Sequence, residues 1–551
     1  MKLKPLQFVI SIWILISIAC SMPPLTGARL DQGEQIQLGV IVAQTLTAVA
    51  DAQSIPTEAE YLIPTGSSGT PAVTQVSPQN GTPEPDIEPS LEPLQTGSGS
   101  PYPDGVESGF FLNSEADDTE EKFLYYAQSG DTLEFISARF SVPPEQVRSD
   151  EKLKSGGLLP PGQSLTIPGY IRNTLLYQPL LPDSEVVYSP SAADFSIQEY
   201  IDSSGGYLSR HREHVYDRWL TGAEIIQKVS TESSVNPMLL LAFLQQRSGW
   251  VLGEPPEPVD KLYPIGLRVS GKKGLYFELV MCATQINKGY YGGRAGIIKE
   301  LKFKDRERGR LNPQLNAGTY GIQYLFSLFY DQGRWANNLY GPEGFLALYQ
   351  EMFPGVWERA AAVEPLLEAE LVQPELELPF QPGERWSLTG GPHYSWNDGS
   401  PRGALDFAPV TGEPACEVSR AWVTASTDGY LTRSAHNVAV IDLDGDRFEG
   451  SGWSILYLHL AEESLTQAGK AVRLDDRLGH PSCERGVNTG THVHIARKYN
   501  GEWLPADGSV PFILSGWEVF ADELNYKGGM QKGEQLVVAN VNGPRTSIVV
   551  R

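Results

Sequence analysis

The chain has 551 residues, 43 Lys and Arg against 67 Asp and Glu, and a net charge of −24 at pH 7. This length exceeds what one hydrophobic core usually serves and predicts about two to four domains. The acidic balance argues against nucleic acid as a partner, because binding phosphates requires a basic surface. Much of the acid lies between positions 31 and 121, which hold sixteen Asp or Glu residues and no Lys or Arg.

The first twenty residues read "MKLKPLQFVISIWILISIAC". Two lysines precede an apolar run that is too short to span a bilayer, which predicts an export signal over residues 1–20. Because Ala19 directly precedes Cys20, the segment resembles a bacterial lipoprotein signal. That resemblance implies a lipid on Cys20, a membrane anchor and an extracytoplasmic location, at the cell surface or in the periplasm. A plain signal peptide or an uncleaved anchor is the alternative.

Residues 21–122 are rich in Pro, Gly, Ser, Thr and acidic side chains. Such a segment buries too little apolar surface to offset its chain entropy, so we expect a disordered, extended acidic tether. Within it, "LGVIVAQTLTAVADA" at 38–52 has the apolar spacing of a helix and is expected to fold locally.

The residue pattern of 125–168 predicts a strand, a turn, an amphipathic helix capped by Asp131, a second helix from Pro144 and a closing strand. The stretches "SGDTL" and "LPPGQSLTIP" resemble the two ends of a LysM domain. This resemblance implies a βααβ module over 123–169 that binds glycans containing N-acetylglucosamine. A LysM fold that serves only as a spacer is the alternative.

Residues 190–360 are predicted to be mostly helical, and residues 223–250 hold two apolar-periodic runs broken at Asn236–Pro237. This stretch resembles the core of lysozyme-like lytic transglycosylases, which carry a catalytic Glu before Ser-Gly. Here that position is Arg247, in "QQRSG". An arginine cannot act as the general acid of a glycosidase, so we expect a non-catalytic scaffold or glycan-binding domain. An unrelated helical domain is the alternative.

Residues 361–377 are acidic and interrupted by proline, which indicates a linker. After it, short apolar stretches bounded by Gly, Asp and Asn turns predict an antiparallel β domain over 378–551. Examples are "AWVTAS", "NVAVIDL", "SILYLHL" and "HVHIARKY". Six of the chain's eight histidines lie between positions 393 and 494 of this domain.

Two of the four cysteines, Cys416 and Cys483, lie in this β domain and are candidates for a disulfide in an exported protein. We expect Cys282, which would then be unpaired, to be a small buried apolar residue.

The stretch "GTHVHI" places His492 and His494 two residues apart. On a strand they point to the same face, where two imidazoles without partners would be costly to bury but would suit a metal site. Further candidate residues lie upstream: His393 in "GGPH", Asp406 in "ALDFAP" and His459 in "LYLHL".

In order, these motifs resemble the lysostaphin-type zinc endopeptidases of bacterial cell walls, and in particular their beta-lytic branch. The commoner branch of that family writes the first two ligands as H-x-x-x-D, but here the residue four before Asp406 is Arg402. The beta-lytic branch instead has a histidine thirteen residues before the aspartate, which is the spacing from His393 to Asp406.

The resemblance implies a zinc ion held by His393, Asp406 and His494. It implies that His492 is the general base that activates water. His459 would stabilise the transition state or assist proton transfer.

A second acidic pattern, "DLDGDRFEGSGW", resembles a calcium loop with Asp442, Asp444 and Asp446. It lacks the spacing of the full twelve-residue calcium-loop pattern with its final Glu. A polar hairpin between two strands is the favoured interpretation.

The predicted fold is therefore multidomain: an acidic tether, a LysM module, a mostly α lysozyme-like domain and a C-terminal antiparallel β-sheet metallopeptidase domain. The predicted function is an exported zinc metalloendopeptidase that hydrolyses peptide bonds of peptidoglycan. Its LysM module would bind the glycan strands, and its peptidase domain the peptide cross-links. The alternative is a non-catalytic wall-binding adaptor that activates another hydrolase, and such an adaptor should have lost a metal ligand.

Overall fold

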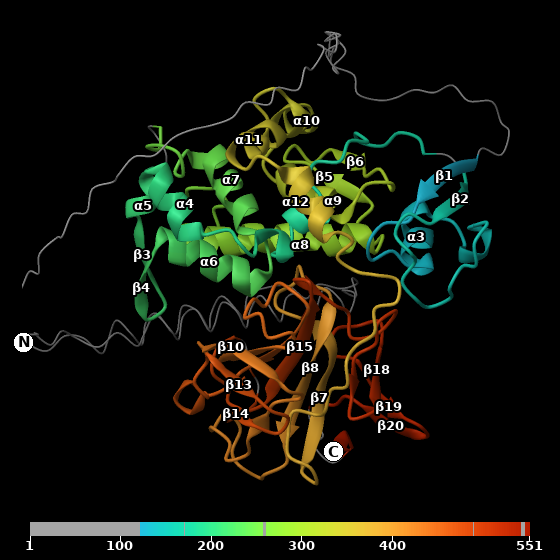
Figure 1. The fold of residues 1–551 in the computed structure, drawn as a ribbon, viewed down its shortest axis with the longest axis vertical. Helices are drawn as coiled ribbons and strands as arrows, with labels where there is room; N and C mark the ends of the chain where they lie inside the picture. Colours follow the sequence, from blue (N-terminus) through green and yellow to red (C-terminus); the bar gives the residue numbers. More distant parts are fainter. Residues whose placement is uncertain (1–121, 170, 257–259, 487, 489, 542–545) are drawn as a thin grey trace, which may run out of the picture. The chain divides into compact units, whose positions relative to one another are not determined.

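The computed structural model describes residues 122–169, 171–256, 260–486, 488, 490–541 and 546–551 (Figure 1). The predicted signal, Cys20, the local helix at 38–52 and all of the predicted acidic tether except its last residue, Lys122, lie outside these residues. Within the described ranges, no helix combines the length and apolar character that a membrane span requires.

The first described module pairs strand β1 (Lys122–Tyr126) with strand β2 (Ser164–Pro168) in antiparallel fashion around helix α3 (Leu133–Phe140). The prediction of a second helix from Pro144 is wrong. Only one 3₁₀ turn forms there, at Pro144–Gln146. The chain then becomes extended, because Arg148 bridges to Thr166 of β2, and this pairing leaves no room for another helical turn.

The predicted cap of α3 is also wrong by one residue. Thr132 is the N-cap, and its hydroxyl accepts a hydrogen bond from the backbone N–H of Phe135. Asp131 is buried instead. Its carboxylate accepts hydrogen bonds from the Tyr125 hydroxyl at 2.6 Å and from the Arg139 guanidinium at 2.6 Å. Asp131 therefore neutralises a buried arginine, a role that a sequence pattern does not reveal.

The following segment is mostly helical, as predicted (Figure 1). Two short hairpins interrupt it, β3–β4 (Arg212–Val215 and Arg218–Thr221) and β5–β6 (Glu300–Lys302 and Arg308–Arg310). Its described helices are α4 (Ile197–Ser204), α5 (Tyr207–Arg210), α6 (Gly222–Ser233), α7 (Pro237–Ser248), α8 (Leu275–Arg294), α9 (Ala317–Ser327), α10 (Gln332–Tyr340), α11 (Phe345–Met352) and α12 (Val356–Val363).

The predicted break between α6 and α7 is confirmed. Ser234 has the left-handed conformation that ends α6, and the Asn236 side chain caps α7 by accepting from Met238 N–H. Pro237 occupies the first helical position, where its missing N–H costs nothing. Cys282, on α8, is fully buried in the apolar core of the helical segment, as expected.

The predicted linker at 361–377 is irregular after α12 ends at Val363. It is not loose, however, because Leu366, Leu367 and Leu376 are each buried in an apolar cluster. Proline and acidic residues in this segment indicated the absence of regular structure, but its buried leucines fix it to the domains on both sides.

The C-terminal part is built on an antiparallel sheet of nine described strands (Figure 1). In spatial order these are β13 (Lys470–Val472), β10 (Gly429–Ala435), β11 (Val438–Asp442), β12 (Trp453–Leu458), β15 (Val493–Tyr499), β8 (Arg402–Pro409), β7 (Arg385–Tyr394) and β21 (Ile548–Val550), with β16 (Glu502–Trp503) beside β15. The predicted antiparallel β domain is therefore confirmed, and the four quoted stretches all contain strands.

Smaller sheets flank this one. Strands β9 (Val423–Thr424) and β14 (Arg477–Gly479) form a pair. A separate four-stranded meander contains β17 (Ile513–Leu514), β18 (Trp517–Ala521), β19 (Gly528–Lys532) and β20 (Gln535–Val538).

The central strands have two different faces. Leu405 and Phe407 of β8 pack with Val493 and Ile495 of β15 in one buried apolar cluster. Successive side chains on a strand point to opposite faces, so Asp406 faces away from this core, as does His494 directly opposite it. The polar face at this position carries the candidate site.

Candidate metal centre

Three predicted ligands converge on three adjacent strands. His393 comes from β7, Asp406 from β8 and His494 from β15. His393 Nε2 lies 3.0 Å from His494 Nδ1 and 3.2 Å from Asp406 Oδ1, and His494 Nδ1 lies 3.4 Å from the same oxygen. All three residues are buried, so their polar atoms meet with little access to water.

These atoms fit a zinc ion. At the usual zinc–nitrogen distance of 2.0–2.1 Å, the ligand atoms of a tetrahedral site lie about 3.3 Å apart. Asp406 Oδ1 is buried and makes no hydrogen bond, which is costly for a carboxylate oxygen unless a cation meets it. Two imidazoles and one carboxylate also leave the fourth position open, as a catalytic zinc site requires.

Backbone carbonyls fix the orientation of both histidine rings. The N–H at Nδ1 of His393 donates to Gly391 O at 2.9 Å, and the N–H at Nε2 of His494 donates to Ser395 O at 3.0 Å. Since a carbonyl can only accept, the lone pairs at His393 Nε2 and His494 Nδ1 are left facing Asp406. Such outer contacts set the tautomer of metal-binding histidines.

Gly390 makes room for the carboxylate. It lies opposite Asp406 in the β7–β8 register, where β7 is irregular. A Cβ atom at position 390 would lie 2.4 Å from Asp406 Oδ2, closer than side-chain carbons approach. The glycine in "TGGPH" is therefore a spatial requirement of the site.

The electrostatics keep the aspartate ionised. Burial opposes its charge, but the neighbouring His393 and His492 hold the pKa of Asp406 well below its usual range. Burial also opposes protonation of His393, but Asp406 raises the pKa of that imidazole. The carboxylate of Asp406 thus favours a cation beside it, whether a proton on an imidazole or a metal.

His492 and His459 lie beside the three converging residues. The N–H at Nδ1 of His492 donates to Gly490 O at 2.8 Å, and its Nε2 lies 3.7 Å from Asp406 Oδ1. The ring of His459 lies 4.6 Å from that of His492, centroid to centroid. The expectation that His492 and His494 share one face agrees with their common approach to Asp406.

His459 follows β12 in a left-handed conformation, with φ of 69°. Ser482 holds this turn by donating to His459 O from its N–H at 2.8 Å and its hydroxyl at 3.1 Å. The N–H at Nδ1 of His459 donates to Glu484 O at 3.1 Å, which leaves Nε2 without its proton. Burial, together with His492 and His494, lowers the pKa of His459 to about 3.

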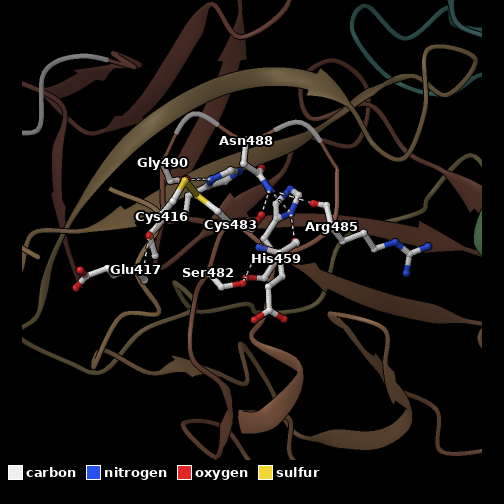
Figure 2. The surroundings of a disulfide bond; sticks show 11 residues. Cys416, Glu417, His459, Ser482, Cys483, Arg485, Asn488 and Gly490 are labelled. Atoms are coloured by element: carbon white, nitrogen blue, oxygen red, sulfur yellow. Dashed lines mark hydrogen bonds between the residues drawn. A yellow bond between two sulfur atoms is a disulfide. The ribbon is translucent and has the colours of Figure 1, made fainter. Parts of the chain in front are cut away.

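The predicted disulfide between Cys416 and Cys483 is present and lies beside His459 (Figure 2). The carbonyl of Cys483 accepts a hydrogen bond from Asn488 Nδ2 at 2.9 Å. The backbone carbonyl of Glu417, next to the other cysteine, accepts one from the Thr491 hydroxyl at 2.7 Å. The bond therefore ties together the two loops that support His459 and His492.

Tyr526 is a residue of the site that sequence reasoning missed. Its ring stacks on His393, with 4.2 Å between centroids and an angle of 18° between planes, and it remains 54% exposed. It follows β18 in a segment with no motif, so only its aromatic character near a glycine pair, "YKGG", could have drawn attention to it.

Arg247, in "QQRSG", makes structural contacts. Its guanidinium donates to Ile265 O at 3.0 Å and to the Tyr330 hydroxyl at 2.8 Å, and it lies over the Phe329 ring at 4.3 Å. These contacts are consistent with a packing role for the residue.

Two segments of the chain match known families. Residues 125–168 match the LysM domain, and residues 179–366 match the N-terminal domain of LasA. The LasA N-terminal domain is a different family from the lysozyme-like transglycosylases, which were expected from residues 223–250. Protease LasA of Pseudomonas aeruginosa strain UCBPP-PA14 is 24% identical over 353 residues, which cover 60% of this chain and 76% of LasA.

Solved structures are also similar to parts of the chain. The M23 metalloprotease pseudoalterin, from the deep sea, is 23% identical, with a TM-score of 0.26, and is matched over 96% of its own length and 30% of this chain. The catalytic domain of lysostaphin from Staphylococcus simulans is 17% identical, with a TM-score of 0.17, over 89% of its length and 22% of this chain.

Proposed function

We propose that this chain, which combines a LysM domain with a LasA-like M23 peptidase architecture, is a zinc metalloendopeptidase that cleaves peptide bonds of peptidoglycan. The observation that carries the proposal is the convergence of His393, Asp406 and His494 around a buried carboxylate oxygen that makes no hydrogen bond. Similarity to a protease supports the peptidase part, and the LysM domain supports the cell-wall part.

In this proposal His393 Nε2, Asp406 Oδ1 and His494 Nδ1 hold the zinc ion. Zinc would polarise the scissile carbonyl and lower the pKa of water toward about 7. The carbonyls of Gly391 and Ser395 keep the two imidazoles in the binding tautomer. The ionised carboxylate of Asp406 would offset part of the charge of the metal.

His492 is proposed as the general base. Its Nε2 faces the same side as the ligands, and its Nδ1–H is already used by Gly490 O, so Nε2 is the nitrogen that can accept a proton from water. His459 presents the other unprotonated Nε2 beside it. We propose that His459 assists the proton transfer or orients the reacting group.

The proposed path of the protein to its substrate follows from the sequence. The export signal would deliver the chain to the extracytoplasmic side, a lipid on Cys20 would anchor it at the membrane, and the LysM module would hold glycan. The competing adaptor hypothesis predicts a missing ligand. Among the described residues all three predicted ligand positions converge, which favours the enzyme.

The test is digestion of purified peptidoglycan by the full chain, with new amino groups and new reducing sugars measured separately. A peptidase releases amino groups, and both a chelator and Asp406→Ala should abolish that release. Asp398 is an exposed aspartate that lies 3.7 Å from Lys288 in an ion pair. Asp398→Ala is therefore the matched control and should retain activity. Release of reducing sugars alone would instead indicate a glycosidase, and no product from the zinc-loaded chain would favour the adaptor.

A further inference from the structure

Three aspartates gather at the end of β11, away from the site described above. Asp442 is the last residue of β11, and Asp444 and Asp446 follow in the loop that leads to β12. One carboxylate oxygen from each lies within 4.8 Å of those of the other two. The loop is the polar hairpin that the sequence predicts, but a hairpin alone does not require three carboxylates to face one another.

Asp442 distinguishes this cluster from an ordinary acidic turn. The residue is fully buried, and its Oδ1 atom has no hydrogen-bond partner, whereas its Oδ2 accepts from Arg447 N–H at 2.9 Å. A buried carboxylate oxygen without a donor is costly, and neighbouring carboxylates add repulsion. A cation between the carboxylates would remove both costs.

The basic side chains nearby are engaged elsewhere. Arg433 and Lys498 both pair with Glu449, each at 2.8 Å. The guanidinium of Arg447 lies over the ring of Tyr430, 4.9 Å from its centroid. None of these three basic side chains therefore pairs with the aspartate cluster.

The loop also makes room for a second carboxylate. A Cβ atom at Gly452 would lie 2.3 Å from Asp444 Oδ2, so only glycine lets Asp444 take this position. Asp446 keeps its place by accepting from Phe448 N–H at 2.7 Å and from the Ser451 hydroxyl at 2.6 Å. Each carboxylate oxygen has a further lone pair to offer a ligand.

We propose that Asp442, Asp444 and Asp446 form a calcium-binding site that is separate from the zinc centre. Calcium takes six to eight oxygen ligands in flexible geometry, so three carboxylates with carbonyls and water can complete its shell. The all-oxygen donor set does not suit zinc, which prefers nitrogen and sulfur ligands.

Calcium there would stiffen the β11–β12 loop, which packs on the helical segment. The Phe448 ring meets the Tyr188 ring edge to face at 5.0 Å. Beyond the loop, β12 leads directly to His459. Calcium binding would therefore stabilise the folded chain and fix the position of β12.

Direct calcium binding to the full zinc-loaded chain, measured by equilibrium dialysis with calcium chloride, tests the proposal. We expect about one calcium per chain and binding at least tenfold weaker in Asp442→Asn and Asp444→Asn. Asp444 is exposed, so its variant should fold even if Asp442→Asn does not. The exposed Glu463 provides the charge-matched control, Glu463→Gln, which should bind like the wild type.

The midpoint of thermal unfolding gives a second readout. Calcium at a hundred times its dissociation constant should raise the midpoint by about 5 °C in the wild type and in Glu463→Gln, but not in Asp444→Asn. Absence of calcium binding, or equal binding by Asp444→Asn and Glu463→Gln, would overturn the proposal. Neither measurement depends on peptidase activity, so the result is separate from that of the zinc hypothesis.

Discussion

At the candidate metal centre, the position of Asp406 depends on a residue that offers no side chain. Gly390→Ala would place a methyl group 2.4 Å from Asp406 Oδ2 and displace the carboxylate. We expect zinc affinity to fall by about 10- to 100-fold, the usual range for changes that disturb the support of a ligand. Zinc titration against a competing chelator measures this.

Gly253→Ala is the control for this substitution. A Cβ at Gly253 meets nothing within 4 Å, so zinc affinity should not change. Wild-type zinc affinity in Gly390→Ala would mean that Asp406 is not a ligand in this position.

His459 should affect catalysis without affecting metal content. Its left-handed backbone is a conformation that asparagine tolerates, so His459→Asn should preserve the turn. We expect kcat to fall by roughly 10²–10³, as for loss of a proton-transfer or transition-state-stabilising group, with the zinc content unchanged. If the variant lost its zinc, His459 would be supporting the ligands rather than the reaction.

The position of a site residue could be predicted from the sequence where it depends on the regular geometry of one strand. The two-residue period of a strand was enough to place His492 and His494 on one face. His393 required family resemblance, because its partner Asp406 is thirteen positions away across a hairpin with irregular register. Tyr526 could not be predicted, since its contact with His393 arises only from tertiary folding.

At the scale of elements, the disulfide joins the two loops that support His459 and His492 (Figure 2). It closes a loop with a sequence separation of 67 residues, for which the chain-entropy model gives about 4 kcal/mol of stability. We therefore expect the double variant Cys416→Ser, Cys483→Ser to unfold at lower denaturant concentration. A reducing agent should shift the wild type in the same direction and leave the double variant unchanged.

The elements themselves were predicted unevenly. Apolar periodicity located α6, α7, β12 and β15, but it did not predict β7, the strand that carries His393. The prediction of a second LysM helix was wrong, because Arg148 pairs with β2 and the chain after Pro144 becomes extended instead of helical. Asp131 had the residue type of an N-cap, but a buried arginine holds it elsewhere. In both cases a long-range contact prevails over a local signal.

At the scale of the whole molecule, Arg294 on α8 joins the helical segment to the β-sheet. Its guanidinium binds Glu502 of β16, with Nη2 to Oε1 at 2.9 Å, and it also meets Asp183 at 3.2 Å. All three residues are buried. Arg294→Ala would leave two carboxylates buried without a cation, so we expect a loss of about 3–5 kcal/mol in unfolding free energy.

The same helix offers a control for this prediction. Lys288 also reaches the β domain, where it pairs with Asp398 at 3.7 Å, but the two side chains are 41% and 59% exposed. Lys288→Ala should cost less than about 1 kcal/mol in the same denaturant experiment. Equal effects of the two variants would show that the buried network does not stabilise the contact.

The zinc hypothesis is tested by the zinc content and peptidoglycan-peptidase activity of the full chain, measured for the wild type, His393→Ala and His214→Ala. His214 is an exposed histidine of the helical segment and serves as the control. We expect about one zinc per chain and activity in the wild type and in His214→Ala, with both lost in His393→Ala. A folded wild type without zinc, or a His393→Ala variant that keeps its full zinc content, would contradict it.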